Sequence, residues 1–195
     1  MAKTTKGEQS KIKLIECAAG LFLKKGYNAT GINDILAGTG LPKGSFYFHF
    51  TSKKDLAISV SQYFEKRFEG WMLRNSKDKK WNEFITALIG EMIEGAEEGK
   101  HYGCPFAVLG LEIAFSDADL SECYYNSMKK LIKLFASIFE YSGVPKDEKY
   151  VLANRAFAIY EGYLVYYRLG KEVDTLRMML KDLIKVYDDF CTMQK

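Results

Sequence analysis

The chain has 195 residues, of which 48% are hydrophobic and 27% are charged, so it carries enough apolar side chains for a buried core and is not a disordered chain. We expect no signal peptide, because no apolar run follows the basic N-terminus, and no membrane span, because no stretch approaches about 18 uncharged apolar residues. Four widely spaced cysteines without a C-x-x-C pattern then predict a cytoplasmic protein with reduced thiols. The net charge of +3 is uneven, since residues 1–54 hold nine lysines and three acidic residues, which is typical of a segment that meets a polyanion.

Apolar residues at helical spacing fill most of the chain and predict an all-α protein of about nine helices. The first helix is expected to run from an N-cap at Ser10 to about Lys25. Thr30 is expected to cap a short helix over residues 31–38, which a glycine-containing turn separates from a second short helix over residues 42–50. Two helices of about two turns bury little apolar surface by themselves, so we expect the first helix to pack behind them.

The later helices are expected to be longer, and their boundaries follow from caps, glycines and prolines. They are predicted over residues 52–74, 79–98, 105–115, 119–141, 145–169 and 173–192. Ser52 is the expected N-cap of the first of these. Pro42, Pro105 and Pro145 each stand where a first helical turn should begin, a position where the missing N–H breaks no hydrogen bond.

The second short helix has one face of small and hydrogen-bonding side chains. That face comprises Lys43, Gly44, Ser45, Tyr47 and His49. The glycine permits close approach to a groove, and the other side chains can donate to base edges or phosphates. Lys53, in the first turn of the next helix, adds a charge beside free backbone N–H groups and is a candidate phosphate clamp. These features predict a helix-turn-helix that binds double-stranded DNA, although an ordinary helical hairpin with a solvated polar face has the same spacing.

Other classes of function have weaker support. Residues 38–44 contain three glycines, but they follow a helix rather than a strand and have the wrong spacing for a dinucleotide-binding loop. No phosphate-binding loop, hydrolase nucleophile motif or H-E-x-x-H motif occurs, so we do not expect an enzyme. A helical protein-interaction module is the remaining alternative.

The segment from Gly26 to Leu56, which includes the run GLPKGSFYFHF over residues 40–50, resembles the TetR family of repressors. The resemblance implies a DNA-binding domain over residues 1–55 and a helical ligand-binding and dimerisation domain over residues 56–195. It further implies a homodimer that binds a pseudo-palindromic DNA operator and a small-molecule inducer, with no cofactor. By position, the family's DNA contacts fall on Thr30, Asn33, Lys43, Gly44, Ser45, Tyr47, His49 and Lys53. Asn33 departs from the arginine that relatives often carry.

The resemblance places dimerisation on the last two helices. The final helix has an apolar stripe that suits either such an interface or the intramolecular core. The stripe comprises Leu176, Met179, Leu180, Leu183, Ile184, Val186 and Tyr187. Gly162, in the preceding helix, would permit close approach of another helix.

A ligand pocket is expected among the aromatic residues of the second part. Tyr160 and Tyr163 add polar groups to a mostly apolar helix face, and with Glu112 and Glu161 they are candidates for lining a pocket for a mainly apolar ligand. Aromatic residues at helical spacing equally suit a plain core.

Cys104 directly precedes an expected helix N-terminus, where the helix dipole lowers the pKa of a thiol and makes it reactive. The Gly103-Cys104 pair, with Leu111-Glu112 and the acidic turn at residues 117–119, resembles the electrophile-sensing NemR-type branch of the family. A small buried residue is the alternative role for Cys104. No metal site is expected, because no further ligand accompanies the pair of His101 and Cys104.

Together these patterns and the resemblance predict a DNA-binding transcriptional regulator, a repressor that a small-molecule inducer releases from a palindromic operator, with an electrophile as one candidate inducer.

Overall fold

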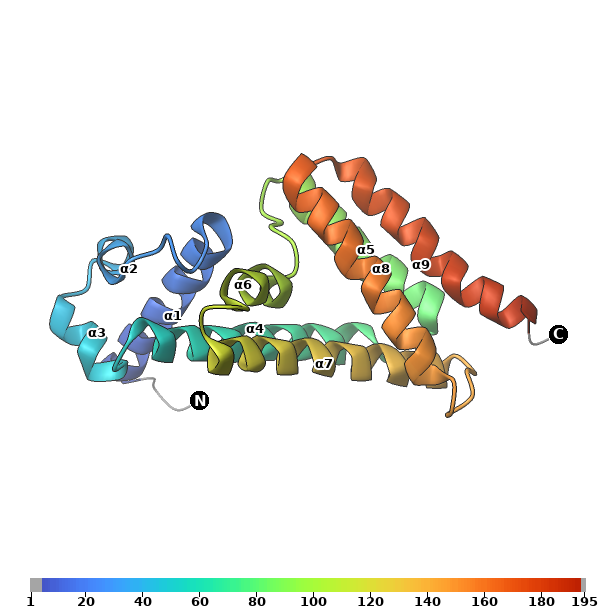
Figure 1. The fold of residues 1–195 in the computed structure, drawn as a ribbon, viewed down its shortest axis with the longest axis horizontal. Helices are drawn as coiled ribbons and strands as arrows, with labels where there is room; N and C mark the ends of the chain where they lie inside the picture. The colour runs from blue at the N-terminus through green and yellow to red at the C-terminus, as the bar shows by residue number, and fades with distance from the viewer. Residues whose placement is uncertain (1–4, 194–195) are drawn as a thin grey trace. The chain divides into compact units, whose positions relative to one another are not determined.

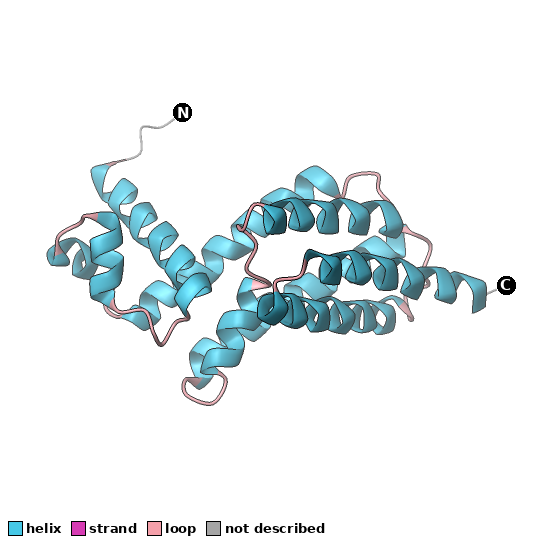
Figure 2. Cartoon of the chain, turned by 90° about the horizontal axis from the view of Figure 1, so that it is seen from above, coloured by secondary structure: helices cyan, strands magenta, loops and turns pink. Residues whose placement is uncertain are grey.

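The computed structural model describes residues 5–193, apart from the side chains of residues 72 and 73, and these residues form nine helices and no strand (Figures 1 and 2). The helices are α1 (Lys6–Lys25), α2 (Ile32–Thr39), α3 (Lys43–His49), α4 (Lys53–Asn75), α5 (Trp81–Glu97), α6 (Pro105–Ile113), α7 (Ala118–Tyr141), α8 (Lys149–Gly170) and α9 (Val173–Met193). The prediction of an all-α protein with about nine helices is confirmed. None of the helices so described is long and apolar enough to cross a membrane.

The chain folds into two compact units. The first unit contains Met1–Phe68 and Pro105–Ser127, and the second contains Glu69–Cys104 and Met128–Lys195. The chain therefore passes between the units within α4, immediately before α6, and within α7. This division reflects which residues pack together. The predicted boundary between a DNA-binding and a ligand-binding domain after residue 55 is a functional division, and it stays a prediction.

Helix α1 begins one turn earlier than predicted, so the expected N-cap at Ser10 is wrong. Thr5 is the N-cap: its hydroxyl accepts a hydrogen bond from the Glu8 amide at 3.2 Å, and the Glu8 carboxylate accepts one from the Thr5 amide at 2.7 Å. This capping box satisfies two amides that a helix end would otherwise leave free. Ser10 lies inside the helix, where its hydroxyl donates to the Gly7 carbonyl at 2.8 Å.

The N-cap of α2 is Gly31, so the predicted cap at Thr30 is also wrong. The Asp34 carboxylate accepts a hydrogen bond from the Gly31 amide at 2.8 Å, so the amide of the N-cap residue is satisfied from inside the helix. The Thr30 hydroxyl instead donates to the Gly26 carbonyl at 2.7 Å and is fully buried. Gly40 ends α2 in the left-handed conformation with φ of 66°, which permits the tight turn into α3.

The first unit contains the three-helix core that the sequence predicts. Leu14 and Phe22 of α1, Ile35 of α2 and Phe46 of α3 are all fully buried. Helix α1 thus packs against both short helices. The two short helices are held by apolar burial, and their outer faces stay free for other contacts.

The second unit has a core that the stripe on α9 helps to build. Leu176, Met179 and Leu183 are fully buried, and α9 packs against α5 and α8. The Trp81 indole donates to the Leu183 carbonyl at 2.9 Å, and its ring stacks on Phe139 at 3.9 Å between centroids. Of the two interpretations of the stripe, the intramolecular core is therefore confirmed for these residues.

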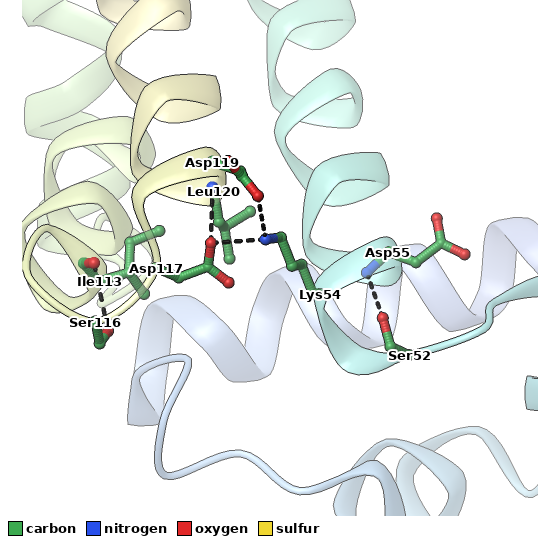
Figure 3. Close-up of polar contacts among 8 residues, drawn as sticks. All are labelled: Ser52, Lys54, Asp55, Ile113, Ser116, Asp117, Asp119 and Leu120. Carbon is green, nitrogen blue, oxygen red and sulfur yellow. Dashed lines mark hydrogen bonds and ion pairs between the residues drawn. The ribbon is translucent and has the colours of Figure 1, made fainter.

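The predicted N-cap of α4 and the predicted start of α8 can both be compared with the structure. The Ser52 hydroxyl accepts a hydrogen bond from the Asp55 amide at 3.1 Å, so the predicted cap of α4 is confirmed (Figure 3). The predicted helix start at Pro145 is wrong, because the residues after it form a turn in which the Glu148 amide donates to the Pro145 carbonyl at 3.1 Å. Helix α8 begins only at Lys149.

Candidate nucleic-acid interface

One face of α3 is open to solvent while the other is buried. Lys43, Gly44 and Tyr47 are exposed, whereas Phe46 is fully buried. A Cβ atom added at Gly44 would meet no atom within 4 Å, so the helix presents bare backbone at this point. Ser45, at the margin of this face, is half-buried. The structure thus brings these four predicted residues to one helix, with three of them fully available to a partner.

The predicted contacts in and before α2 divide into one exposed and one buried residue. Asn33 is exposed on α2. Thr30 has no exposed surface, and its hydroxyl is bound to the Gly26 carbonyl. The Thr30 side chain is thus engaged within the first unit, and its predicted contact with DNA stays a prediction.

Lys53 is engaged inside the first unit rather than free to clamp a phosphate. Its ammonium donates to the carbonyls of Tyr27 at 2.9 Å and Thr30 at 3.0 Å, and it lies 4.3 Å from the centre of the Tyr27 ring. Partial burial lowers the pKa of this ammonium. The lysine ties the start of α4 to the loop between α1 and α2, and its predicted contact with a phosphate stays a prediction.

His49 is likewise tied to its own unit. Its Nε2 lies 2.7 Å from the Ser10 hydroxyl on α1, and its side chain is half-buried. This bond joins the end of α3 to the first half of α1. His49 therefore fixes the angle of α3 and has one ring nitrogen already occupied.

Sequence reasoning missed two exposed residues next to the predicted interface. Phe48 of α3 is 79% exposed, although an aromatic side chain at helical spacing is usually assigned to a core. The Lys11 ammonium lies 5.6 Å from the centre of the Phe50 ring, which brings a positive charge on α1 to the end of α3. The excess of lysines in residues 1–54 was a signal for Lys11, and no local pattern distinguishes Phe48 from the buried phenylalanines beside it.

A carboxylate from α6 holds the end of α1. Glu112 accepts hydrogen bonds from the backbone amides of Tyr27 and Asn28, each at 2.7 Å. Gly26 precedes these amides with φ of 93°, and a Cβ atom there would lie 2.8 Å from the carboxylate. Only glycine fits both the backbone conformation and the space. Glu112 was predicted to line a ligand pocket; in the structure both carboxylate oxygens accept hydrogen bonds within the first unit, and the predicted role stays a prediction.

A second link joins the start of α4 to the start of α7 (Figure 3). The Lys54 ammonium lies 2.8 Å from Asp117 and 3.0 Å from Asp119. Asp117 also accepts a hydrogen bond from the Leu120 amide at 3.1 Å and so caps α7. The Lys54 ammonium, followed by the Leu120 amide, lowers the pKa of the Asp117 carboxyl.

The remaining predicted ligand residues lie in the second unit. Cys104 is 4% exposed and forms a hydrogen bond with the Glu161 carboxyl on α8, and burial raises the pKa of that carboxyl to about 7 although the thiol opposes the shift. Tyr160, next to it on α8, is 3% exposed. The Tyr163 hydroxyl instead donates to Asp182 on α9 at 2.5 Å, at the unit's surface. The structure thus groups Cys104, Tyr160 and Glu161, leaves Tyr163 apart from them, and buries the thiol that an electrophile would have to reach. Among residues 5–193 no cluster of three or more metal-binding side chains occurs.

The fold and the exposed α3 face define a DNA-binding protein of the helix-turn-helix class. Residues 14–60 match the family model of bacterial regulatory proteins of the tetR family, and residues 82–182 match that of the LmrA/YxaF-like transcriptional regulator C-terminal domain. The HTH-type transcriptional repressor DhaR of Mycobacterium sp. (strain GP1) is 43% identical over 178 residues, which cover 86% of each chain. The chain belongs to the TetR family of transcriptional regulators, a family of DNA-binding proteins rather than enzymes.

Solved structures of the family have the same fold. A TetR-family regulator from Cytophaga hutchinsonii superposes with a TM-score of 0.84 at 19% identity, over 96% of this chain and 98% of that one. Reduced NemR of E. coli superposes with a TM-score of 0.76 at 18% identity, over 90% and 95%. Identity this low shows the fold alone, so membership in a NemR-like branch stays a prediction.

Proposed function

We propose that the chain acts as a homodimeric repressor that binds a palindromic operator through the exposed face of α3 and releases it when a small molecule binds the second unit. The observation that carries this proposal is the two-sided character of α3. Lys43, Gly44 and Tyr47 face solvent, while Phe46 anchors the helix in the core. Repression is favoured over activation because the relative DhaR is named a repressor.

The proposed contacts divide into residues that touch DNA and residues that position them. Lys43 and Tyr47 reach base edges or phosphates from α3, and Asn33 does so from α2. Gly44 lets the backbone approach the groove, and Ser45 contacts the DNA from the edge of the same face. Lys11 is the added phosphate contact. The positioning residues are Thr30, His49 and Lys53.

The dimer interface is proposed on α8, whose outer face is apolar although it is exposed in the single chain. That face comprises Val151, Ala158, Gly162, Val165, Tyr166 and Leu169, all of them exposed. Tyr166 and Leu169 are 72% and 81% exposed, and an apolar stripe of this length is unusual on a surface that contacts only water. Nothing lies within 4 Å of a Cβ atom added at Gly162, so the glycine serves no packing need within the chain. A second copy of α8 would explain both features.

The test is selection of binding sequences from a random pool of DNA duplexes by the full-length protein, followed by anisotropy measurements on the selected site. We expect a palindrome whose half-sites are about one helical turn, roughly 10 base pairs, apart. Lys43→Ala should weaken binding and relax base preference at one position, by about 1–3 kcal/mol if it reads a base. Lys185→Ala, an exposed lysine of α9, is the matched control and should change neither. Failure to select any sequence would refute the proposed function.

A further inference from the structure

Helix α3 carries one large apolar side chain that the rest of the described chain leaves exposed. Phe48 is 79% exposed, whereas Phe46 and Phe50, two residues to either side of it, are buried. The hydrophobic effect accounts for the buried pair, because their apolar surface is removed from water. It does not account for Phe48, since a phenylalanine that stays in water forgoes this stabilisation.

Phe48 lies on the face of α3 that the proposed DNA contacts share. Side chains four residues apart lie above one another on a helix, so Phe48 follows Gly44 in one row and Tyr47 follows Lys43 in the next. Both rows are exposed, and the buried Phe46 faces the opposite side. The Lys43 ammonium lies 5.9 Å from the centre of the Tyr47 ring, so a positive charge lies in the row beside the exposed phenylalanine. The apolar ring therefore belongs to a surface that suits a polyanion.

The Phe48 ring is also held in place. Its centre lies 4.8 Å from that of the His49 ring, and the two ring planes meet at 81°, which is an edge-to-face contact. The Nε2 atom of His49 lies in turn 2.7 Å from the Ser10 hydroxyl on α1. Helix α3 is thus tied to α1 directly beside the exposed ring. A side chain that is ordered before binding loses less rotamer freedom when it meets a partner.

The chemistry of the side chain limits what it can read. Phenylalanine has no hydrogen-bonding group, so Phe48 can neither bind a phosphate oxygen nor pair with a donor or acceptor of a base edge. On the base edges of the major groove, the apolar group is the C5-methyl of thymine. Gly44, one turn earlier in the same row, has no atom within 4 Å of an added Cβ atom, so the backbone can approach the bases and bring Phe48 to them rather than to deoxyribose alone.

We propose that Phe48 contacts a thymine methyl group in each half-site of the operator and so determines the base at that position. The inference rests on the proposed function, since it names one base that α3 reads. It assigns the exposed face of α3 two roles: Lys43 and Tyr47 supply hydrogen bonds, and Phe48 supplies an apolar contact.

The test replaces each thymine of the selected palindrome in turn, in both half-sites, by deoxyuridine, which lacks only the methyl group. Binding of the full-length protein is measured by anisotropy at one fixed salt concentration, because the affinity of a DNA complex depends on salt. Burial of one methyl group corresponds to roughly fourfold in affinity, and thus to roughly 15-fold for two half-sites. We expect wild-type protein to lose about this much affinity at one thymine position.

Phe48→Ala should bind the thymine duplex roughly 15-fold more weakly, and it should not distinguish thymine from deoxyuridine at that position. Because Phe48 is exposed, this variant should keep a melting temperature close to that of wild type. Phe115→Ala is the matched control. Phe115 is fully exposed in the turn after α6, so its loss should leave both the affinity and the preference for thymine as in wild type.

A palindrome without thymine, or wild-type protein that tolerates deoxyuridine at every thymine, would refute the inference; weaker binding by Phe48→Ala would then indicate contact with deoxyribose. A Phe48→Ala variant that keeps wild-type affinity, or that still loses affinity at every sensitive thymine, would refute it as well. In each of these cases the selected palindrome leaves the proposed function standing. A chain that selects no DNA sequence would refute the proposed function and this inference with it.

Discussion

Glu112→Gln should loosen the end of α1 without disturbing the rest of the first unit. The carboxylate accepts two hydrogen bonds of 2.7 Å, from the amides of Tyr27 and Asn28. Glutamine keeps one acceptor oxygen and turns an NH2 donor toward the other amide. A hydrogen bond to a charged group contributes about 1.5–3 kcal/mol. Water replaces part of the loss at the more exposed Asn28 amide, so we expect local opening to become easier by about 2 kcal/mol.

Amide hydrogen exchange, followed by mass spectrometry at fixed protein concentration, measures this change where it occurs. A loss of about 2 kcal/mol corresponds to roughly 30-fold faster exchange in peptides that contain residues 27 and 28. Glu122→Gln, an exposed glutamate of α7, is the control and should leave these peptides unchanged. Exchange in the Glu112 variant that equals that of wild type would show that the contact does not hold α1, and the link from α6 to the DNA-binding helices would be refuted.

Three further changes test other parts of the structure. Gly162→Ala should stabilise α8 by up to about 1 kcal/mol through helix propensity, and yet weaken the dimer in analytical ultracentrifugation because its methyl group would separate the two copies of α8. Gly20→Ala, at a position equally free of neighbours within 4 Å, is the control and should leave the dimer intact. Folding raises the pKa of the Glu161 carboxyl from an ordinary 4.5 to about 7, because burial disfavours the charged form. The unfolding free energy should therefore fall by up to about 3 kcal/mol as the pH rises from about 4.5 to above 7. Urea titrations of wild-type protein should show this decline, and those of Glu161→Gln should not. Limiting N-ethylmaleimide should label Cys104, which is 4% exposed, later than the three half-buried cysteines. Early labelling with loss of operator binding would instead support an electrophile sensor.

Hydrophobic periodicity and turn residues allowed the helices to be predicted. The errors at helix starts came from neighbouring residues that can cap a helix equally well. The Thr5 and Glu8 pair is a capping box that stands one turn before Ser10, and both residues can cap a helix. Helix α2 begins one residue later than expected, because the Asp34 carboxylate reaches back to the amide of Gly31 and the Thr30 hydroxyl donates to the Gly26 carbonyl instead. Hydrophobic periodicity identified the buried stripe of α9. Periodicity shows which face of a helix is buried, but not whether that face packs within the chain or against a second copy.

The contacts that set the candidate site depend on residues far apart in the chain. Lys53 has the spacing of a phosphate clamp, yet it binds carbonyls 23 and 26 residues earlier. Glu112 binds amides 84 and 85 residues away. No pattern within a helix predicts such pairs, because side-chain periodicity describes a face and not what covers it. The exposure of Lys43, Gly44 and Tyr47 on α3 could be predicted, because it depends only on that helix and its own core, whereas that of Phe48 could not.

The order of residues along the chain suggests how the two units are coupled. His101 and Cys104 belong to the second unit, and α6 begins at the next residue, Pro105. Glu112 near the end of that helix holds the amides that follow α1. Helix α6 belongs to the first unit, so the contact of Glu112 lies within that unit, and the chain enters the unit at Pro105. We expect Glu112→Gln to reduce the effect of an inducer on operator affinity while leaving inducer affinity in the absence of DNA unchanged, and an unchanged effect on the operator would show that the Glu112 contact takes no part in the response.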